Sequence, residues 1–165
     1  MLQGHLQTRI TPRKTPIGTI HILWHIKDNR PVIYKVILPG NLNRKVKFTS
    51  LPLKTVKMEN LALDLCSKFQ RKVLNTVYKI PAGFVSTYAC IAKKLSTSPR
   101  SIGRALATNP FPIIVPCHRI VKSDGSLGGY QGKAWMKKRL LETEGIKFDE
   151  NNIIDKNKIL REVKS

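Results

Sequence analysis

The sequence lacks the features that mark membrane and secreted proteins. No apolar run approaches the roughly 20 residues that a membrane-spanning helix needs. Residues 1–13 are polar and basic, without the apolar region of a secretory signal. We therefore expect no membrane partner and a cytoplasmic location.

Acidic residues are scarce, and one long stretch has none. The chain carries 10 Asp+Glu against 30 Lys+Arg, a formal net charge of +20. No acid stands between Asp64 and Asp124, whereas ten basic residues do: Lys68, Arg71, Lys72, Lys79, Lys93, Lys94, Arg100, Arg104, Arg119 and Lys122. A clean basic stretch favours a polyanionic partner, most often nucleic acid. The less favoured alternative is a thermophilic or lysine-rich bias of the whole proteome.

Cysteine is scarce too, and its spacing argues against a disulfide framework. The three cysteines are Cys66, Cys90 and Cys117, and no two form a CxxC pair. A reducing environment is the default for such a chain. The spacing leaves a bridge between Cys66 and Cys90 open.

The first third of the chain is rich in β-strand signals. Residues 17–26 alternate apolar and other side chains, and residues 32–38 are a second apolar run. The turn residues 28–31 lie between the two runs, so we predict a hairpin. Residues 46–48 are a third, short strand candidate. We expect a small α/β domain over residues 1–57.

From Glu59 the apolar period becomes helical. The recurring positions are Ala62, Leu65, Cys66, Phe69, Val73 and Val77, and Pro81 follows them. Further helices are predicted at residues 87–95, 100–107 and 133–144. The turn at residues 96–99 makes the pair at 87–95 and 100–107 a helix-turn-helix candidate. We expect a second domain over residues 58–150 and a polar tail, helical or frayed, over residues 151–165.

The most informative segment is residues 113–120, Ile-Ile-Val-Pro-Cys-His-Arg-Ile. Cys117 and His118 follow a proline at the end of an apolar run, at the rim of a buried element. A thiol attacks as thiolate, a form that a neighbouring histidine and the charge of Arg119 favour. A zinc site at Cys117 and His118 is a poor interpretation, because adjacent residues seldom chelate one ion. The pattern therefore indicates a nucleophilic cysteine.

These pieces together resemble the O6-alkylguanine-DNA alkyltransferases. The residues that carry the resemblance, in order, are 80–83 (Ile-Pro-Ala-Gly), Tyr88, Arg100 with Gly103, Asn109 with Pro110, 116–120, 128–130 (Gly-Gly-Tyr), Leu140 with Leu141, and Glu144 with Gly145. They cover about residues 66–147. The resemblance implies a small N-terminal α/β domain with an antiparallel sheet. It also implies a mostly helical, winged-helix-like C-terminal domain that binds DNA and holds the reactive cysteine.

In this family one cysteine irreversibly takes the alkyl group from O6 of guanine, and each molecule acts once; O4-alkylthymine is a further candidate substrate. The resemblance makes Cys117 the acceptor, His118 the base acting through a water, and Glu144 the residue that orients the imidazole. Asn109 would tie the DNA-binding helix to the active-site strand. Without the resemblance, Glu144 would be read as a solvated acid at a helix end.

The resemblance also assigns DNA contacts. The damaged base must leave the duplex stack, and Arg100 would fill its place while Tyr88 lies beside the rotated phosphate. The helix at 100–107 would enter the minor groove, where Gly103 and Ala105 are small enough for close approach. Arg104 departs from the family's small residue and is expected either to add a phosphate contact or to narrow the fit. Lys93 and Lys94 would follow the DNA backbone.

The base pocket is expected to be walled by Pro112, Tyr130, Gln131 and Ile120. Gln131 stands where many family members have serine. Some members carry zinc in the first domain, but here no cysteine accompanies His5, His21 and His25, so we expect no metal and no cofactor. We expect a monomer that binds double-stranded DNA. Two alternatives stay open: a non-catalytic protein that recognises alkylated DNA, and a helix-turn-helix transcription factor.

Overall fold

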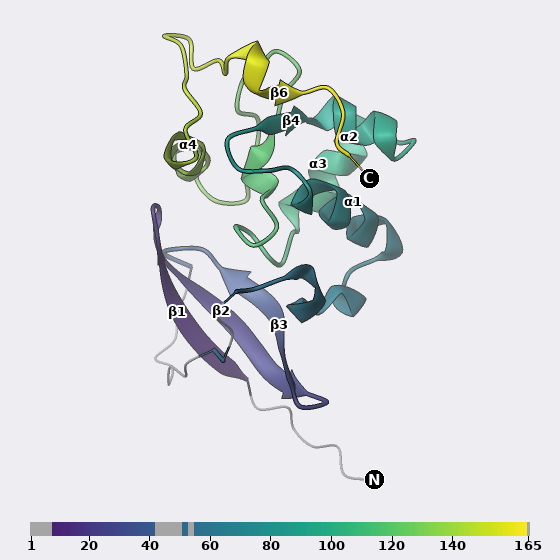
Figure 1. Ribbon diagram of the computed structural model, residues 1–165, viewed down its shortest axis with the longest axis vertical. Helices are drawn as coiled ribbons and strands as arrows, with labels where there is room; N and C mark the ends of the chain where they lie inside the picture. The colour runs from purple at the N-terminus through teal and green to yellow at the C-terminus, as the bar shows by residue number, and fades with distance from the viewer. Residues whose placement is uncertain (1–7, 42–50, 53–54, 165) are drawn as a thin grey trace. The chain divides into compact units, whose positions relative to one another are not determined.

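The computed structural model describes residues 8–41, 51–52 and 55–164 (Figure 1). The chain divides into two compact units, Met1–Leu65 and Cys66–Ser165. The division falls at residue 65 and not near residue 57. Its cause is local: the backbone N–H of Ala62 donates to the carbonyl of Ile33 at 2.7 Å, so this segment belongs with the first sheet.

The first unit contains a three-stranded antiparallel sheet in the order β1-β2-β3. The strands are β1 (Arg9–Thr15), β2 (Gly18–Lys27) and β3 (Arg30–Ile37). Asp28 and Asn29, both at positive φ, join β2 to β3, as a two-residue hairpin turn requires. The predicted hairpin and antiparallel sheet are confirmed. Strand β1 was not predicted because its sequence is mostly polar, and residues 46–48 lie outside the described ranges.

Helix α1 (Lys68–Tyr78) begins later than its apolar pattern predicts. The side chain of Ser67 accepts from the backbone N–H of Gln70 and caps the helix start. Residues 58–60 and 63–65 form short 3-10 turns instead. Leu65 is therefore 68% exposed and Phe69 37%, so their predicted inward positions are wrong, whereas Val73 and Val77 are fully buried.

The predicted helix-turn-helix is present as α2 (Tyr88–Lys94) and α3 (Pro99–Ala107). Thr87 caps α2, Ser98 caps α3, and Pro99 takes the first helical position. Helix α4 (Ala134–Thr143) follows the glycine-rich loop. In the part of the chain that is described, no helix is long and apolar enough to cross a membrane.

A second, parallel sheet of three short strands lies in the second unit, in the order β5-β4-β6. Its strands are β4 (Val85–Thr87), β5 (Ile120–Val121) and β6 (Ile159–Leu160). The expectation of a helical or frayed tail is thus wrong, because β6 pairs with β4. We call residues 149–164 the C-terminal strap.

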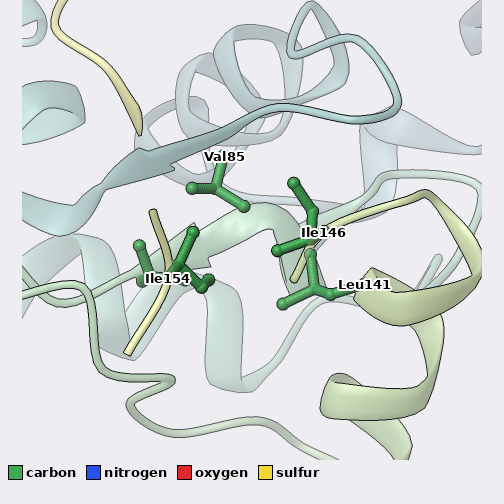
Figure 2. Close-up of a cluster of buried hydrophobic side chains, with 5 residues drawn as sticks. Val85, Leu141, Ile146 and Ile154 are labelled. Carbon is green, nitrogen blue, oxygen red and sulfur yellow. The ribbon is translucent and has the colours of Figure 1, made fainter. Parts of the chain in front are cut away.

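The core between this sheet and α4 includes the strap. Val85, Val121, Leu141, Ile146 and Ile154 form one buried cluster. In Figure 2 the labelled side chains converge from the sheet, from α4 and its end, and from the strap. Because β5 directly follows Cys117-His118-Arg119, this cluster fixes the strand that carries the candidate site.

Candidate active site

Cys117 opens a 3-10 turn, η3 (Cys117–Arg119), that leads into β5. The turn before it is tight: Val115 N–H donates to Phe111 O at 2.8 Å, and Ile113 has φ +74°. A positive φ at a β-branched residue is strained and persists only where the surroundings enforce it. The segment therefore holds Cys117, 5% exposed, in one defined place.

Asn109 ties the end of α3 to this segment. Its Oδ1 accepts from the N–H of Phe111 at 2.9 Å, and its Nδ2 donates to Val115 O at 3.4 Å. The Asn109 side chain is 2% exposed, so these bonds are protected from water. The residue lies between the helix and the cysteine, as the sequence predicts.

His118 and Glu144 meet as expected, although 26 positions separate them. His118 Nε2 lies 2.9 Å from Glu144 Oε1. Glu144 ends α4, and η3 packs against that helix. The other ring nitrogen, Nδ1, is buried and has no hydrogen-bond partner within the described residues. With Nε2–H donating to the carboxylate, Nδ1 keeps a free lone pair for a proton.

Arg119 completes the carboxylate's environment. Its Nε donates to Glu144 Oε2 at 2.9 Å and its Nη2 to Glu144 Oε1 at 2.6 Å, a two-pronged pair. Its Nη1 donates to the carbonyl of Ile80 at 2.6 Å. Burial alone would raise the pKa of Glu144, but hydrogen bonds from His118 and Arg119 hold that pKa at about 2. Glu144 is therefore ionised at any physiological pH.

The resting thiol and imidazole are both neutral. Burial raises the pKa of Cys117, more than hydrogen bonds from Asn109 and Gln131 and the charge of Lys137 lower it. Burial likewise lowers the pKa of His118, against the opposing effect of Glu144. Desolvation therefore outweighs the neighbouring charges in the resting state, and the thiolate has to form during the reaction.

Lys137 is a site residue that the sequence did not reveal. Lys137 lies on α4, and its side chain is fully buried. Its ammonium donates to the carbonyls of Ile120 at 2.6 Å, of Leu127, and of Gly129 at 3.1 Å. Burial lowers the pKa of Lys137 to about 8, against the opposing effect of Cys117. Lys137 thus joins β5 to the glycine-rich loop beside the thiol.

An open cavity of about 650 Å³ lies over the thiol. It brings together six of the predicted residues: Tyr88, Arg100, Gly103, Cys117, Tyr130 and Gln131. Tyr88 Oη donates to Gly129 O at 3.1 Å, and Gln131 Nε2 lies 3.9 Å from Cys117 Sγ. Burial, then the charge of Cys117, raises the pKa of Tyr88 and of Tyr130, so both phenols keep their protons.

Other predicted residues lie outside this cavity. Pro112 and Ile120 are buried behind the lining and do not form it. Arg104 and Ala105 border a neighbouring groove of about 290 Å³. Lys93 and Lys94 end α2, and Lys94 Nζ donates to Val163 O at 2.7 Å. Lys94 is therefore bonded to the strap.

The structure also decides the disulfide question. Cys66, Cys90 and Cys117 are free thiols, so no Cys66–Cys90 bridge is present. Cys90 Sγ lies 3.2 Å from Arg161 O. Among residues 8–41, 51–52 and 55–164, no three metal-binding side chains come together, and His5 lies outside these ranges.

The second unit carries the sequence similarity to a known protein family. The sequence model of the family described as 6-O-methylguanine DNA methyltransferase, DNA binding domain, matches residues 68–146. A methylated-DNA–protein-cysteine methyltransferase of Methanothermobacter thermautotrophicus is 50% identical over 84 residues, 51% of this chain and 48% of the relative. One of Archaeoglobus fulgidus is 48% identical over 87 residues, 48% of this chain and 58% of the relative. The chain thus spans about half the length of these relatives.

Two solved structures extend the likeness to both units. The OGT of Mycobacterium tuberculosis in complex with DNA is 26% identical, with a TM-score of 0.63 over 82% of this chain and 92% of that one. An O6-methylguanine DNA methyltransferase from Methanococcus jannaschii is 30% identical, with a TM-score of 0.50 over 81% and 95%. Fold and site define a protein with a sheet domain and a helical domain that buries a thiol–imidazole–carboxylate set. This chain belongs to the 6-O-methylguanine DNA methyltransferase family.

Proposed function

We propose that this protein repairs DNA by moving an alkyl group from O6-alkylguanine irreversibly to Cys117, with O4-alkylthymine as a further candidate substrate. The observation that carries this is the buried thiol of Cys117 beneath an open cavity bordered by α3, next to a buried His118 that is bonded to Glu144. The family supports the same assignment, since its curated relatives carry the name methylated-DNA–protein-cysteine methyltransferase. The reaction needs no cofactor, because the sulfur is itself the acceptor.

The proton and electron changes fit the resting charges. The thiol proton of Cys117 passes through one water to Nδ1 of His118, and Glu144 stabilises the resulting imidazolium. The sulfur pair then forms a bond to the alkyl carbon as the carbon–O6 bond breaks. The purine takes up one proton from the solvent of the open cavity and leaves as a neutral base, and His118 returns the proton it received from the thiol to the solvent. The product is a thioether at Cys117, which no residue of the site can reverse.

The DNA contacts belong to α2, α3 and the cavity rim. Helix α3 enters the minor groove of double-stranded DNA, and the alkylated base rotates out of the stack into the cavity. A volume of about 650 Å³ lies within the range of roughly 300–1,000 Å³ of small-molecule sites. Arg100 fills the vacated stack, Tyr88 lies beside the rotated phosphate, and Gly103 allows close approach to the sugars.

The remaining predicted residues take the following roles in this proposal. Arg104 and Lys93 are exposed and bind phosphates. Ala105 and Lys94 act through packing and through the strap, since Ala105 is buried and Lys94 is bonded to Val163. Tyr130 and Gln131 wall the base, while Pro112, Ile120 and Asn109 support that wall from behind. The protein acts as a monomer.

The intact mass after incubation with a duplex containing O6-methylguanine tests the proposal. We expect one added methyl group, saturating at one per chain and mapping to Cys117. Cys117→Ala should take up none yet bind the same duplex. Tight binding without any mass change in the unaltered chain would overturn alkyl transfer in favour of damage recognition. Equal binding of undamaged and damaged duplexes would favour a transcription factor.

A further inference from the structure

Gln70, on the first turn of α1, reaches across to the C-terminal end of α3. Its Nε2 lies 3.0 Å from Ala105 O, 3.1 Å from Thr108 O and 3.0 Å from Thr108 Oγ1. The last carbonyls of a helix have no partner within the helix, and a donor from outside satisfies them. Gln70 is therefore a cap for α3 supplied by another helix.

We call these contacts of Gln70 the clamp. Its α1 end is rigidly held. Val73, Leu74 and Val77 of α1 are fully buried, and Ser67 caps the turn that carries Gln70. Helix α3 has a small buried face. Its buried face consists of Ile102, Ala105 and Leu106, of which Ala105 has only a methyl group. A polar clamp at one end thus limits tilting that this small apolar face permits.

The orientation of α3 matters most at its other end. Nine residues span about 13 Å, so a tilt of about 10° about the packed middle of the helix, once its C-terminal end is released, moves Arg100 by roughly 1 Å. Positioning errors of about 1 Å reduce rates by large factors. Arg100 borders the cavity mouth, whereas Cys117 is held by the strained turn at Ile113 and by bonds that Asn109 makes to Phe111 and Val115 and not to Gln70. Loss of the clamp should therefore disturb duplex engagement and leave the thiol in place.

We infer that Gln70 is a positioning residue that sets the angle of α3 for duplex DNA. The inference rests on the proposed function, since it takes α3 as the helix that enters DNA. It predicts that two reactions respond differently to the loss of Gln70, which the loss of a merely structural residue would not cause. Reaction with duplex DNA should depend on Gln70, and reaction with a free base that diffuses into the cavity should not.

The test compares Gln70→Met, which keeps the length but removes the donors, with Gln70→Lys, whose ammonium restores a donor to carbonyls. Asn75→Met, at an exposed position of the same helix, is the matched control. Three quantities are measured: duplex affinity, the rate constant with O6-methylguanine duplex, and that with O6-benzylguanine free base. For Gln70→Met we expect both duplex quantities to fall about tenfold, as the loss of one or two hydrogen bonds implies. The free-base rate should stay within about twofold, and Gln70→Lys should recover most of the duplex loss.

The outcomes separate this inference from the proposed function. Equal losses on duplex and free base, or a duplex loss no larger than that of Asn75→Met, would overturn the positioning role. If the unaltered chain transfers no alkyl group, the proposed function fails and duplex affinity alone decides on Gln70. Unchanged affinity in Gln70→Met would then reject the clamp as well.

Discussion

Burial controls the proton on Cys117 more strongly than any neighbouring charge does. It raises the pKa of the thiol and lowers that of His118, so the pair rests uncharged. Glu144, in contrast, stays ionised because His118 and Arg119 bond both of its oxygens. A negative charge fixed behind a neutral imidazole favours the protonated ring at the moment of transfer. The attacking thiolate of Cys117 is thus formed during the reaction and is not present in the resting site.

Glu144→Gln should slow alkyl transfer and shift its pH dependence. Removing the carboxylate removes two effects that raise the pKa of His118, so this pKa falls further. The rate requires the neutral base, so the acid side of the pH profile should move to lower pH. The plateau should fall by roughly 10²-fold, the usual contribution of acid–base catalysis. The second-order transfer rate measured against pH checks both changes.

Glu142→Gln is the control for this change, because Glu142 is an exposed acid on the same helix. We expect its profile to match that of the unaltered protein. If the acid side moves equally in both variants, the effect is one of general charge, and Glu144 does not act through His118.

At this scale the sequence predicted the reacting residues better than their supports. Cys117 and His118 stand in a motif, and the family resemblance supplied Glu144. Lys137 is followed by Lys138 and Arg139, and no acidic residue stands three or four positions away to pair with it. This pattern is typical of a solvated helix face. Its burial depends on three carbonyls from β5 and the glycine-rich loop, which only the tertiary structure brings together.

Among the elements, those with an apolar period and a cap were predictable. Helices α2 and α3 begin where Thr87 and Ser98 indicate. Helix α1 was extended too far because the apolar residues of the linking segment continue its period by chance. The strap was missed because its strand is two residues long and takes its partner from β4, more than seventy residues earlier.

Ile154→Ala should destabilise the second unit even though Ile154 lies in what reads as a tail. Its side chain is 1% exposed and packs with Val85 and Leu141 (Figure 2). Removing a buried isoleucine to alanine costs about 3 kcal/mol of unfolding free energy, through lost burial and a remaining cavity. Urea unfolding measures this loss. The neighbouring Ile153→Ala, half-buried, should cost clearly less; equal losses would place Ile154 outside the core.

At the scale of the whole molecule, basic residues outnumber acidic ones by twenty. Among the described residues, only three pairs come within ion-pair distance, and two of them converge on Glu144. The net charge of +20 is thus largely uncompensated within the protein. Such a charge favours association with a polyanion and does not determine the fold.

Duplex binding should therefore weaken steeply with salt, because each neutralised phosphate releases counterions. The logarithm of affinity falls by about 0.9 per phosphate contact for each unit of log salt. Arg104→Gln, at an exposed position of α3, should lower this slope by about 1. Titrations from about 50 to 200 mM salt measure the change.

Lys138→Gln removes the same charge from α4 and serves as the control. The Lys138 ammonium bonds to Asn152 and lies 5.3 Å from the Phe148 ring centroid, so it is held against the strap. Its loss should leave the slope unchanged, because a cation held within the protein neutralises no phosphate. Equal slopes in both variants would mean that only total charge matters. A flat salt dependence of the unaltered protein would remove the basic surface from the account of DNA binding altogether.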